Sequence, residues 1–184
     1  LYSYGRQPAI CRKNLQLLQN PLAMLLPRPR MEESLERYAS KYQNHYRFCL
    51  VRRLGLTTNP DLESDERLVS ATLELIASWP VGYGDFFAGL ASAIQSAGLP
   101  QEPEGLPVFL NDGPAPAREM WQNWRNAWWW QTQAREAPGS EPEASVPEGL
   151  RRWNLSQTPT RPLIESLWEP IDQEDDWRPV GGWL

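Results

Sequence analysis

The chain has 184 residues, 41% of them hydrophobic, and a formal net charge of −5. This length is sufficient for one domain with a hydrophobic core. Because the net charge is negative, the whole molecule has no electrostatic attraction to nucleic acid or to an anionic membrane, and we predict neither as a partner. No apolar run reaches the roughly 18 residues that a membrane-spanning helix needs. The chain holds only two cysteines, so we expect a soluble, cytoplasmic protein.

The N-terminal part is expected to form two helices separated by a proline-rich break. Residues 8–26 place Pro8 at the first helical position, where its missing N–H costs nothing, and repeat apolar side chains at helical spacing. Pro21 is expected to kink or split this helix. After the break at PRPR, residues 31–54 show the clearest helical pattern in the chain, and Gly55 provides the expected C-terminal stop.

One face of the helix predicted over 31–54 carries large side chains, many of them tyrosine. Steps of three and four residues place these side chains together, with charged residues on the opposite face. We therefore interpret this tyrosine stripe as a core face that packs on the preceding helix and on the helix containing Phe86 and Phe87. The stripe consists of Met31, Leu35, Tyr38, Tyr42, Tyr46 and Cys49.

Further helices are predicted downstream from apolar spacing and from capping signals. Asn59 and Asp85 are the expected N-cap residues, since a side-chain oxygen at that position accepts from the first free backbone N–H groups. The third of these helices contains WQNWRNAWWW and is the richest in tryptophan. The predicted helices cover 59–79, 85–98, 116–136 and 160–170, with a proline- and glycine-rich loop over 99–116.

No alternating pattern typical of β-strands is found, so the predicted fold class is all-α. The stretch APGSEPEASVPEG is interpreted as a flexible linker, because so few apolar side chains cannot offset the entropy cost of ordering. Four parts are expected: a helical segment over 1–98, the loop and tryptophan-rich helix over 99–136, the linker over 137–149, and a short helix with an acidic tail over 150–184.

The chemistry-bearing side chains form no catalytic motif. A glycine-rich phosphate loop, HExxH, GxSxG and CxxC are all missing from the sequence. His45 lies on the tyrosine-rich helix, and we interpret it as a partly buried structural residue rather than a general base. Cys49 falls on the apolar stripe and is interpreted as a core residue. Cys11 follows a predicted helix start beside two basic residues, which is weak evidence for a redox role.

Two clusters have both a functional and a structural interpretation. The acidic residues near the C-terminus could hold a divalent cation, but they lack the spacing of a calcium loop, so we favour a solvated acidic patch. The tryptophans could form a stacking platform for a ligand, but core or interface packing is favoured. The acidic cluster is Asp172, Glu174, Asp175 and Asp176, and the tryptophan face is Trp121, Trp124 and Trp128.

The opening stretch YSYGRQPAICRKNL resembles the segment that follows the activation-loop metal site in the selenoprotein O family, RYxFGNQPxxxxWNL. Later stretches resemble family segments in the same order, including MEESLERYASKYQNHY, RLGL and the closing RPLIESLWEPIDQEDDW, which looks like the cyanobacterial type. The chain departs from the family where Lys13 replaces a Trp, and where its C-terminal GGWL lacks a redox-active Cys. The matching motif positions include Tyr2, Gln7, Pro8 and Asn14.

The resemblance implies both a fold and an activity. Members of the family are pseudokinases that bind ATP and Mg²⁺ and transfer AMP to hydroxyl groups of proteins. The chain would then be the helical C-terminal portion of the kinase-like lobe, with a C-terminal helical extension. The family residues that bind ATP and magnesium precede the matched segment, so the resemblance implies no catalytic, cofactor-binding or metal residue in this chain.

Our leading hypothesis is that the chain is a C-terminal fragment of a selenoprotein O-like protein adenylyltransferase and is inactive alone. Its expected partners are the missing N-terminal catalytic portion and, for the intact enzyme, protein substrates. The alternative is a free-standing helical protein-interaction module derived from the same lobe. A third hypothesis is a ligand-binding domain built on the tryptophans.

Overall fold

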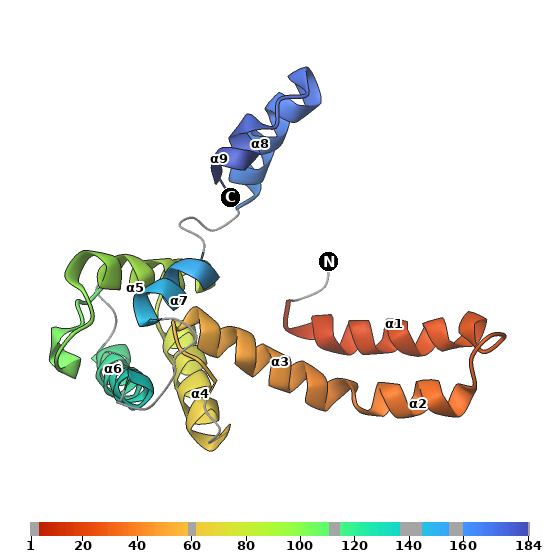
Figure 1. Ribbon diagram of the computed structural model, residues 1–184, viewed down its shortest axis with the longest axis horizontal. Coiled ribbons are helices and arrows are strands. Elements are labelled where there is room, and N and C mark those ends of the chain that lie inside the picture. Colours follow the sequence, from red (N-terminus) through yellow and green to blue (C-terminus); the bar gives the residue numbers. More distant parts are fainter. Residues whose placement is uncertain (1–3, 59–61, 111–114, 137–144, 155–159, 184) are drawn as a thin grey trace.

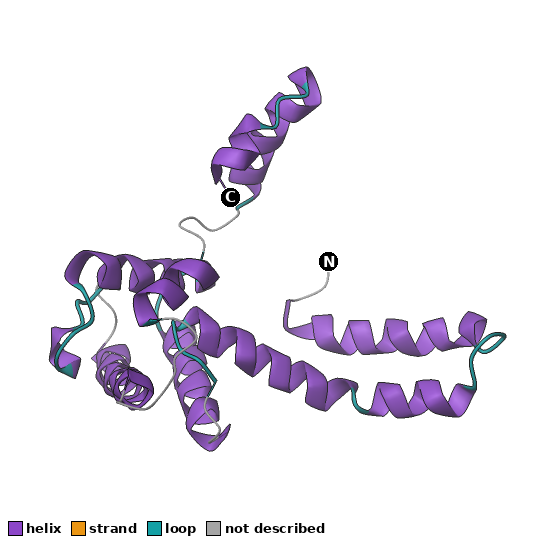
Figure 2. Cartoon of the chain, in the orientation of Figure 1, coloured by secondary structure: helices purple, strands orange, loops and turns teal. Residues whose placement is uncertain are grey.

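The computed structural model describes residues 4–58, 62–110, 115–136, 145–154 and 160–183. Its regular elements in these ranges are all helices, which confirms the predicted all-α class (Figure 2). None of these helices is long and apolar enough to cross a bilayer. Short 3₁₀ helices lie at Tyr4–Arg6 and Pro103–Gly105, and the α-helices are α1 (Gln7–Leu22), α2 (Arg28–Glu36), α3 (Tyr38–Arg53), α4 (Leu62–Ser78), α5 (Tyr83–Ala97), α6 (Ala115–Glu136), α7 (Val146–Trp153), α8 (Arg161–Glu174) and α9 (Arg178–Trp183).

The helices form a central bundle and two projecting hairpins (Figure 1). The bundle contains α4, α5, α6 and α7, packed around the C-terminal end of α3. An N-terminal hairpin of α1 and α2 extends away from the bundle along the direction of α3 (Figure 1). A second hairpin, α8 and α9, stands apart from the other helices (Figure 1).

The hydrophobic core lies within the bundle and is built largely from aromatic side chains. Trp124 of α6 is 1% exposed and Trp128 is fully buried. The ring of Phe86 meets that of Trp124 edge-on at a centroid distance of 5.2 Å, a geometry that aromatic quadrupoles favour. Both indole N–H groups are satisfied, because Trp124 donates to the Thr72 hydroxyl at 2.8 Å and Trp128 donates to the Leu54 carbonyl at 3.0 Å. The preference for packing over a ligand platform is therefore confirmed for the tryptophan face.

The helix predicted over 31–54 is in fact two helices, because the chain turns at Arg37 between α2 and α3. The interpretation of the tyrosine stripe as a core face is wrong: Tyr42 is 39% exposed and Tyr46 is 36% exposed. Burial on α3 begins only at Leu50, where the helix enters the bundle. The tyrosine rings instead stack on one another along the helix, with successive centroids 6.2 and 6.1 Å apart.

Several local predictions need correction. His45 is exposed rather than partly buried, since the first half of α3 lies outside the bundle. Gly82 is the N-cap residue of α5, so Asp85 lies in the first turn and is not the cap. The helix predicted over 8–26 ends at Leu22, one residue after Pro21. The expected cap at Asn59 lies outside the described residues.

The predicted linker is only partly open to comparison, because residues 137–144 lie outside the described ranges. From Ser145 onward the linker prediction is wrong, since a capping box opens α7. The Ser145 backbone N–H and hydroxyl both donate to Glu148 Oε2, at 3.1 and 2.9 Å, and these hydrogen bonds hold the pKa of Glu148 below its ordinary value. The composition of this stretch did not predict a helix, because it holds few apolar side chains. Two of them, Val146 and Leu150, are buried in the core.

The predicted acidic tail is also a folded hairpin. α8 continues to Glu174, and Asp175 ends it in the left-handed conformation with φ 53°. Asp176 then pairs with Arg178 at 2.8 Å, and hydrogen bonds from Arg178 lower the pKa of Asp176 to about 2. Local hydrogen bonds at the turn therefore order a segment whose charge predicted a solvated tail.

Two glycines bring the end of α3 and α7 into backbone contact. Gly55 has φ 77°, and a Cβ placed there would lie 2.7 Å from Leu150 Cγ. A Cβ placed at Gly149 would lie 2.9 Å from the carbonyl oxygen of Gly55. The close approach of the two segments thus depends on both residues having no side chain.

Gly149→Ala is expected to lower the free energy of unfolding by about 1–3 kcal/mol, because its methyl group would push α7 away from the Gly55 backbone. This loss should occur although alanine is the better helix former. Gly181→Ala is the matched control, since Gly181 is also helical and a Cβ there would meet nothing within 4 Å. Urea denaturation followed by circular dichroism measures both variants. Equal stability of the two variants would contradict the backbone contact.

Candidate functional site

An apolar groove runs between α1, α2 and the first half of α3. It encloses about 550 Å³. Its leucine side chains are strongly exposed for their type, with Leu15 at 44% and Leu18 at 50%. Exposed apolar surface of this kind, gathered in one place, is typical of an interaction site. The apolar lining is Leu15, Leu18, Leu22, Leu26, Met31, Leu35, Tyr38 and Tyr42.

The groove follows from the local sequence. Leu15, Leu18 and Leu22 share one face of α1 at helical spacing. The turn after α1 ends at Pro27, whose extended backbone precedes the first residue of α2 and sends that helix back beside α1. α2 has only nine residues and buries no side chain, so it leaves part of the leucine face uncovered.

The rim of the groove carries positive charge. Arg30 and Lys41 line the groove, and neither forms an ion pair within the part of the chain that the structure describes. Cys11 lies one turn before Leu15 and close to Tyr38. Partial burial, with the neighbouring Cys11 and Tyr42, raises the pKa of Tyr38 above its ordinary value. The groove is therefore apolar at its floor and cationic at its edge.

A second hollow of about 580 Å³ lies between α5 and α7 and is more polar. Two of its polar side chains already have structural partners. Glu148 accepts from Ser145 in the capping box, and the amide of Asn154 donates to the carbonyls of Arg53 and Leu150 at 2.8 and 2.9 Å. The hollow therefore lies along the packing interface between α5 and α7.

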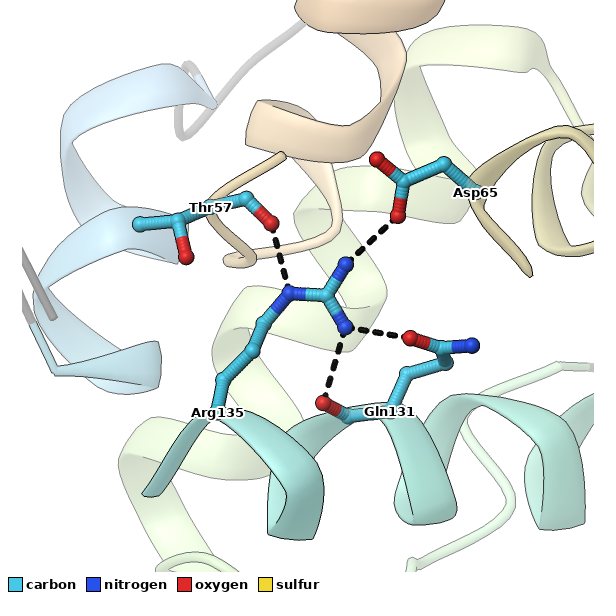
Figure 3. Close-up of polar contacts among 4 residues, drawn as sticks. All are labelled: Thr57, Asp65, Gln131 and Arg135. Atoms are coloured by element: carbon cyan, nitrogen blue, oxygen red, sulfur yellow. Dashed lines mark hydrogen bonds and ion pairs between the residues drawn. The ribbon is translucent and has the colours of Figure 1, made fainter. Parts of the chain in front are cut away.

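Inside the bundle, Arg135 joins three segments of the chain (Figure 3). Its guanidinium donates to the Asp65 carboxylate at 2.5 Å, to the Thr57 carbonyl at 2.5 Å and to the Gln131 carbonyl at 2.9 Å, and it also bonds the Gln131 side chain. Asp65 is fully buried and Arg135 is 8% exposed. Burial lowers the pKa of Arg135, whereas Asp65 opposes that change by favouring the charged form. The network fixes α6 against α4 and the segment that follows α3.

Three of the matched motif positions, Gln7, Pro8 and Asn14, lie on α1 in the N-terminal hairpin. Gln7 and Pro8 begin α1, and Asn14 is exposed one turn before the groove residue Leu18. Tyr2 lies outside the described residues. The described motif positions therefore share one largely exposed helix.

The other candidate residues do not converge on a site. His45 Nε2 lies 3.5 Å from Cys49 Sγ, one turn apart on α3, whereas Cys11 is on α1. Cys49 is half-buried and lies outside the core. The described ranges contain no group of three His, Cys, Asp or Glu side chains able to hold a metal ion, and this includes the acidic cluster of α8 and α9. Sequence reasoning missed the Arg135–Asp65 pair because 70 positions separate its members.

Comparison with known proteins defines the class. The family described as "Protein adenylyltransferase SelO" matches residues 1–184. A "Protein nucleotidyltransferase YdiU" from Trichodesmium erythraeum is 33% identical over 179 residues, and one from a Synechococcus species is 32% identical over 185 residues; each match covers 97% of this chain. The chain therefore belongs to the SelO family of protein adenylyltransferases.

The chain spans only about a third of its relatives, 36% of the length of each of these two proteins. "Protein adenylyltransferase SelO-1, mitochondrial" from Danio rerio is 33% identical over 90 residues, which cover 49% of this chain and 13% of the fish protein. No solved structure is significantly similar to the chain.

Proposed function

We propose that this chain is the C-terminal helical portion of a protein adenylyltransferase and supports the region that transfers AMP from ATP to protein hydroxyl groups. Its family membership and its match to about a third of the length of nucleotidyltransferase relatives support the proposal. The remaining length of those relatives would supply the groups that bind ATP and Mg²⁺. Proteins carrying the acceptor hydroxyl would be the substrates of the intact enzyme.

The exposure of α1 is the observation that carries the proposal. The bundle buries its own core, yet α1 buries only Gln19 among its described side chains. Leu17 is 56% exposed and lies on a different face from the groove leucines. Asn14 lies one turn before both Leu17 and Leu18, so this motif position borders the exposed leucines of α1. A helix that carries the family motif and exposes leucine is suited to packing against the rest of the enzyme.

The described residues bring no ligand set for Mg²⁺ together. Magnesium takes carboxylate and phosphate oxygens in near-octahedral geometry, and the described ranges bring no such group of ligands together. Asp65, the buried carboxylate of the bundle, is occupied by Arg135. The supporting role proposed for this chain rests on its family and on the exposed face of α1.

A chimera tests the proposal. The matched 179-residue segment of the Trichodesmium erythraeum relative would be replaced by this chain, and incorporation of radiolabelled AMP into protein would be measured. We expect the chimera to transfer AMP and the relative lacking the segment to lose at least 10-fold in rate. Leu17→Glu in the chimera should cause a comparable loss, because a charge would enter the proposed contact. Val108→Glu is the matched control, since Val108 is 62% exposed and lies far from α1 in sequence.

Two outcomes would overturn the proposal. The first is a chimera that unfolds cooperatively but transfers no AMP. The second is a truncated relative that keeps full activity, because the segment would then be dispensable for catalysis. That second result would favour the alternative, a helical protein-interaction module, which the self-contained core of the bundle also allows.

A further inference from the structure

The hairpin of α8 and α9 exposes aromatic surface without a partner in this structure. Trp168 and Trp177 are each 57% exposed, and their rings meet edge-on at a centroid distance of 6.4 Å. Ile164, one turn before Trp168, is 51% exposed. α8 buries no side chain, and the hairpin stands apart from the other helices in Figure 1. Two tryptophans and an isoleucine on one small unit favour a docking surface.

The hairpin is also acidic. Its residues 161–183 hold six acidic and two basic side chains, a net charge of −4. The two arginines pair within the hairpin, Arg161 with Glu165 at 2.7 Å and Arg178 with Asp176 at 2.8 Å. Four carboxylates remain without a cationic partner within the described ranges. These are Glu169, Asp172, Glu174 and Asp175.

The N-terminal hairpin and the start of α3 have the opposite charge. Residues 5–42 hold seven basic and three acidic side chains, a net charge of +4. Arg30 and Lys41, at the rim of the apolar groove, have no ion-pair partner in the described part of the chain. The groove and the C-terminal hairpin thus each combine uncovered apolar surface with unpaired charge, and the two charges are opposite.

We propose that the α8–α9 hairpin docks in the groove between α1, α2 and α3 of the same chain, with its tryptophans on the groove leucines and its carboxylates near Arg30 and Lys41. The dimensions agree, since α8 is about 21 Å long and α1 about 24 Å. This internal interface goes beyond the proposed function and involves a different face of α1 from the one assigned to the rest of the enzyme.

Covalent geometry allows the contact within one chain. Asn154, at the end of α7, is held to α3 by hydrogen bonds with Arg53, one of them 3.1 Å long. The seven steps from Asn154 to Arg161 can span about 25 Å at most. Along α3, Arg53 lies about 16 Å from Tyr42 in the groove. A short connection also gives the hairpin a local concentration near millimolar, so binding within the chain exceeds binding between chains at micromolar protein.

Crosslinking tests the proposal on the full chain. Cys49→Ser would leave Cys11 as the reactive thiol beside the groove, and Glu165→Cys would add one on α8. We expect a short bismaleimide to link the two cysteines within one chain at micromolar protein, and the yield to fall in high salt because screening weakens the charge attraction. The readout is chain mobility and mass and does not depend on AMP transfer, so this test is independent of the proposed function.

Variants of the groove and of the hairpin, each with a control on α6, test whether the internal crosslink depends on the proposed contact. Lys41→Glu and Trp168→Ala should each reduce the internal crosslink at least 3-fold. Arg118→Glu makes a comparable charge reversal and Trp130→Ala the same truncation at exposed positions of α6, and both should leave the crosslink yield unchanged. An equal yield in all four variants, or no internal crosslink, overturns the proposal. A crosslink formed only between chains also overturns it, and would assign the groove to a second copy.

Discussion

Arg135→Met is expected to lower the free energy of unfolding by about 3–5 kcal/mol, because it leaves a fully buried carboxylate without its cation. The substitution keeps much of the side-chain volume but removes the donors to Asp65 and to the Thr57 carbonyl. Urea denaturation followed by circular dichroism measures the loss. Arg118→Met is the matched control, since Arg118 is exposed on the same helix, and it should change stability by no more than about 0.5 kcal/mol.

A double variant separates the destabilisation caused by an unpaired buried charge from the net contribution of the ion pair to the free energy of unfolding. Asp65→Leu combined with Arg135→Met should recover most of the stability lost in Arg135→Met, because apolar residues of similar volume often replace a buried pair at little cost. A single Arg135→Met variant within about 1 kcal/mol of the original chain would show that Asp65 does not depend on this partner.

Trp128→Ala is expected to cost about 3–5 kcal/mol, since it opens a cavity in the core. Trp128 is fully buried, and its loss also leaves the Leu54 carbonyl without its indole donor. Trp130→Ala removes the same side chain from a position of α6 that is 66% exposed, and should cost less than about 1 kcal/mol. Thermal and urea unfolding compare the two variants. A similar loss in both would mean that the tryptophan face does not form the core.

The helices themselves could be predicted largely from local signals. Proline at a helix start, apolar repeats of three and four residues, and glycine after the last turn act within a few residues of one another, so they can be read along the chain. The tryptophan face of α6 is one example: its steps place Trp121, Trp124 and Trp128 on one side, and the structure buries all three. The family, too, could be inferred from motifs in order along the sequence.

The sequence by itself thus determined the all-α class, most of the helices and the family. Which faces are covered was decided only by the tertiary structure. The spacing of Tyr38, Tyr42 and Tyr46 puts them on one face, but periodicity carries no information about which other helix lies against that face. Here Tyr38 and Tyr42 line an open groove. Periodicity could not predict the ion pair of Asp65 with Arg135 or the contact of Gly55 with Gly149 either. Each joins residues far apart in the chain, and such contacts depend on how whole helices pack rather than on local sequence.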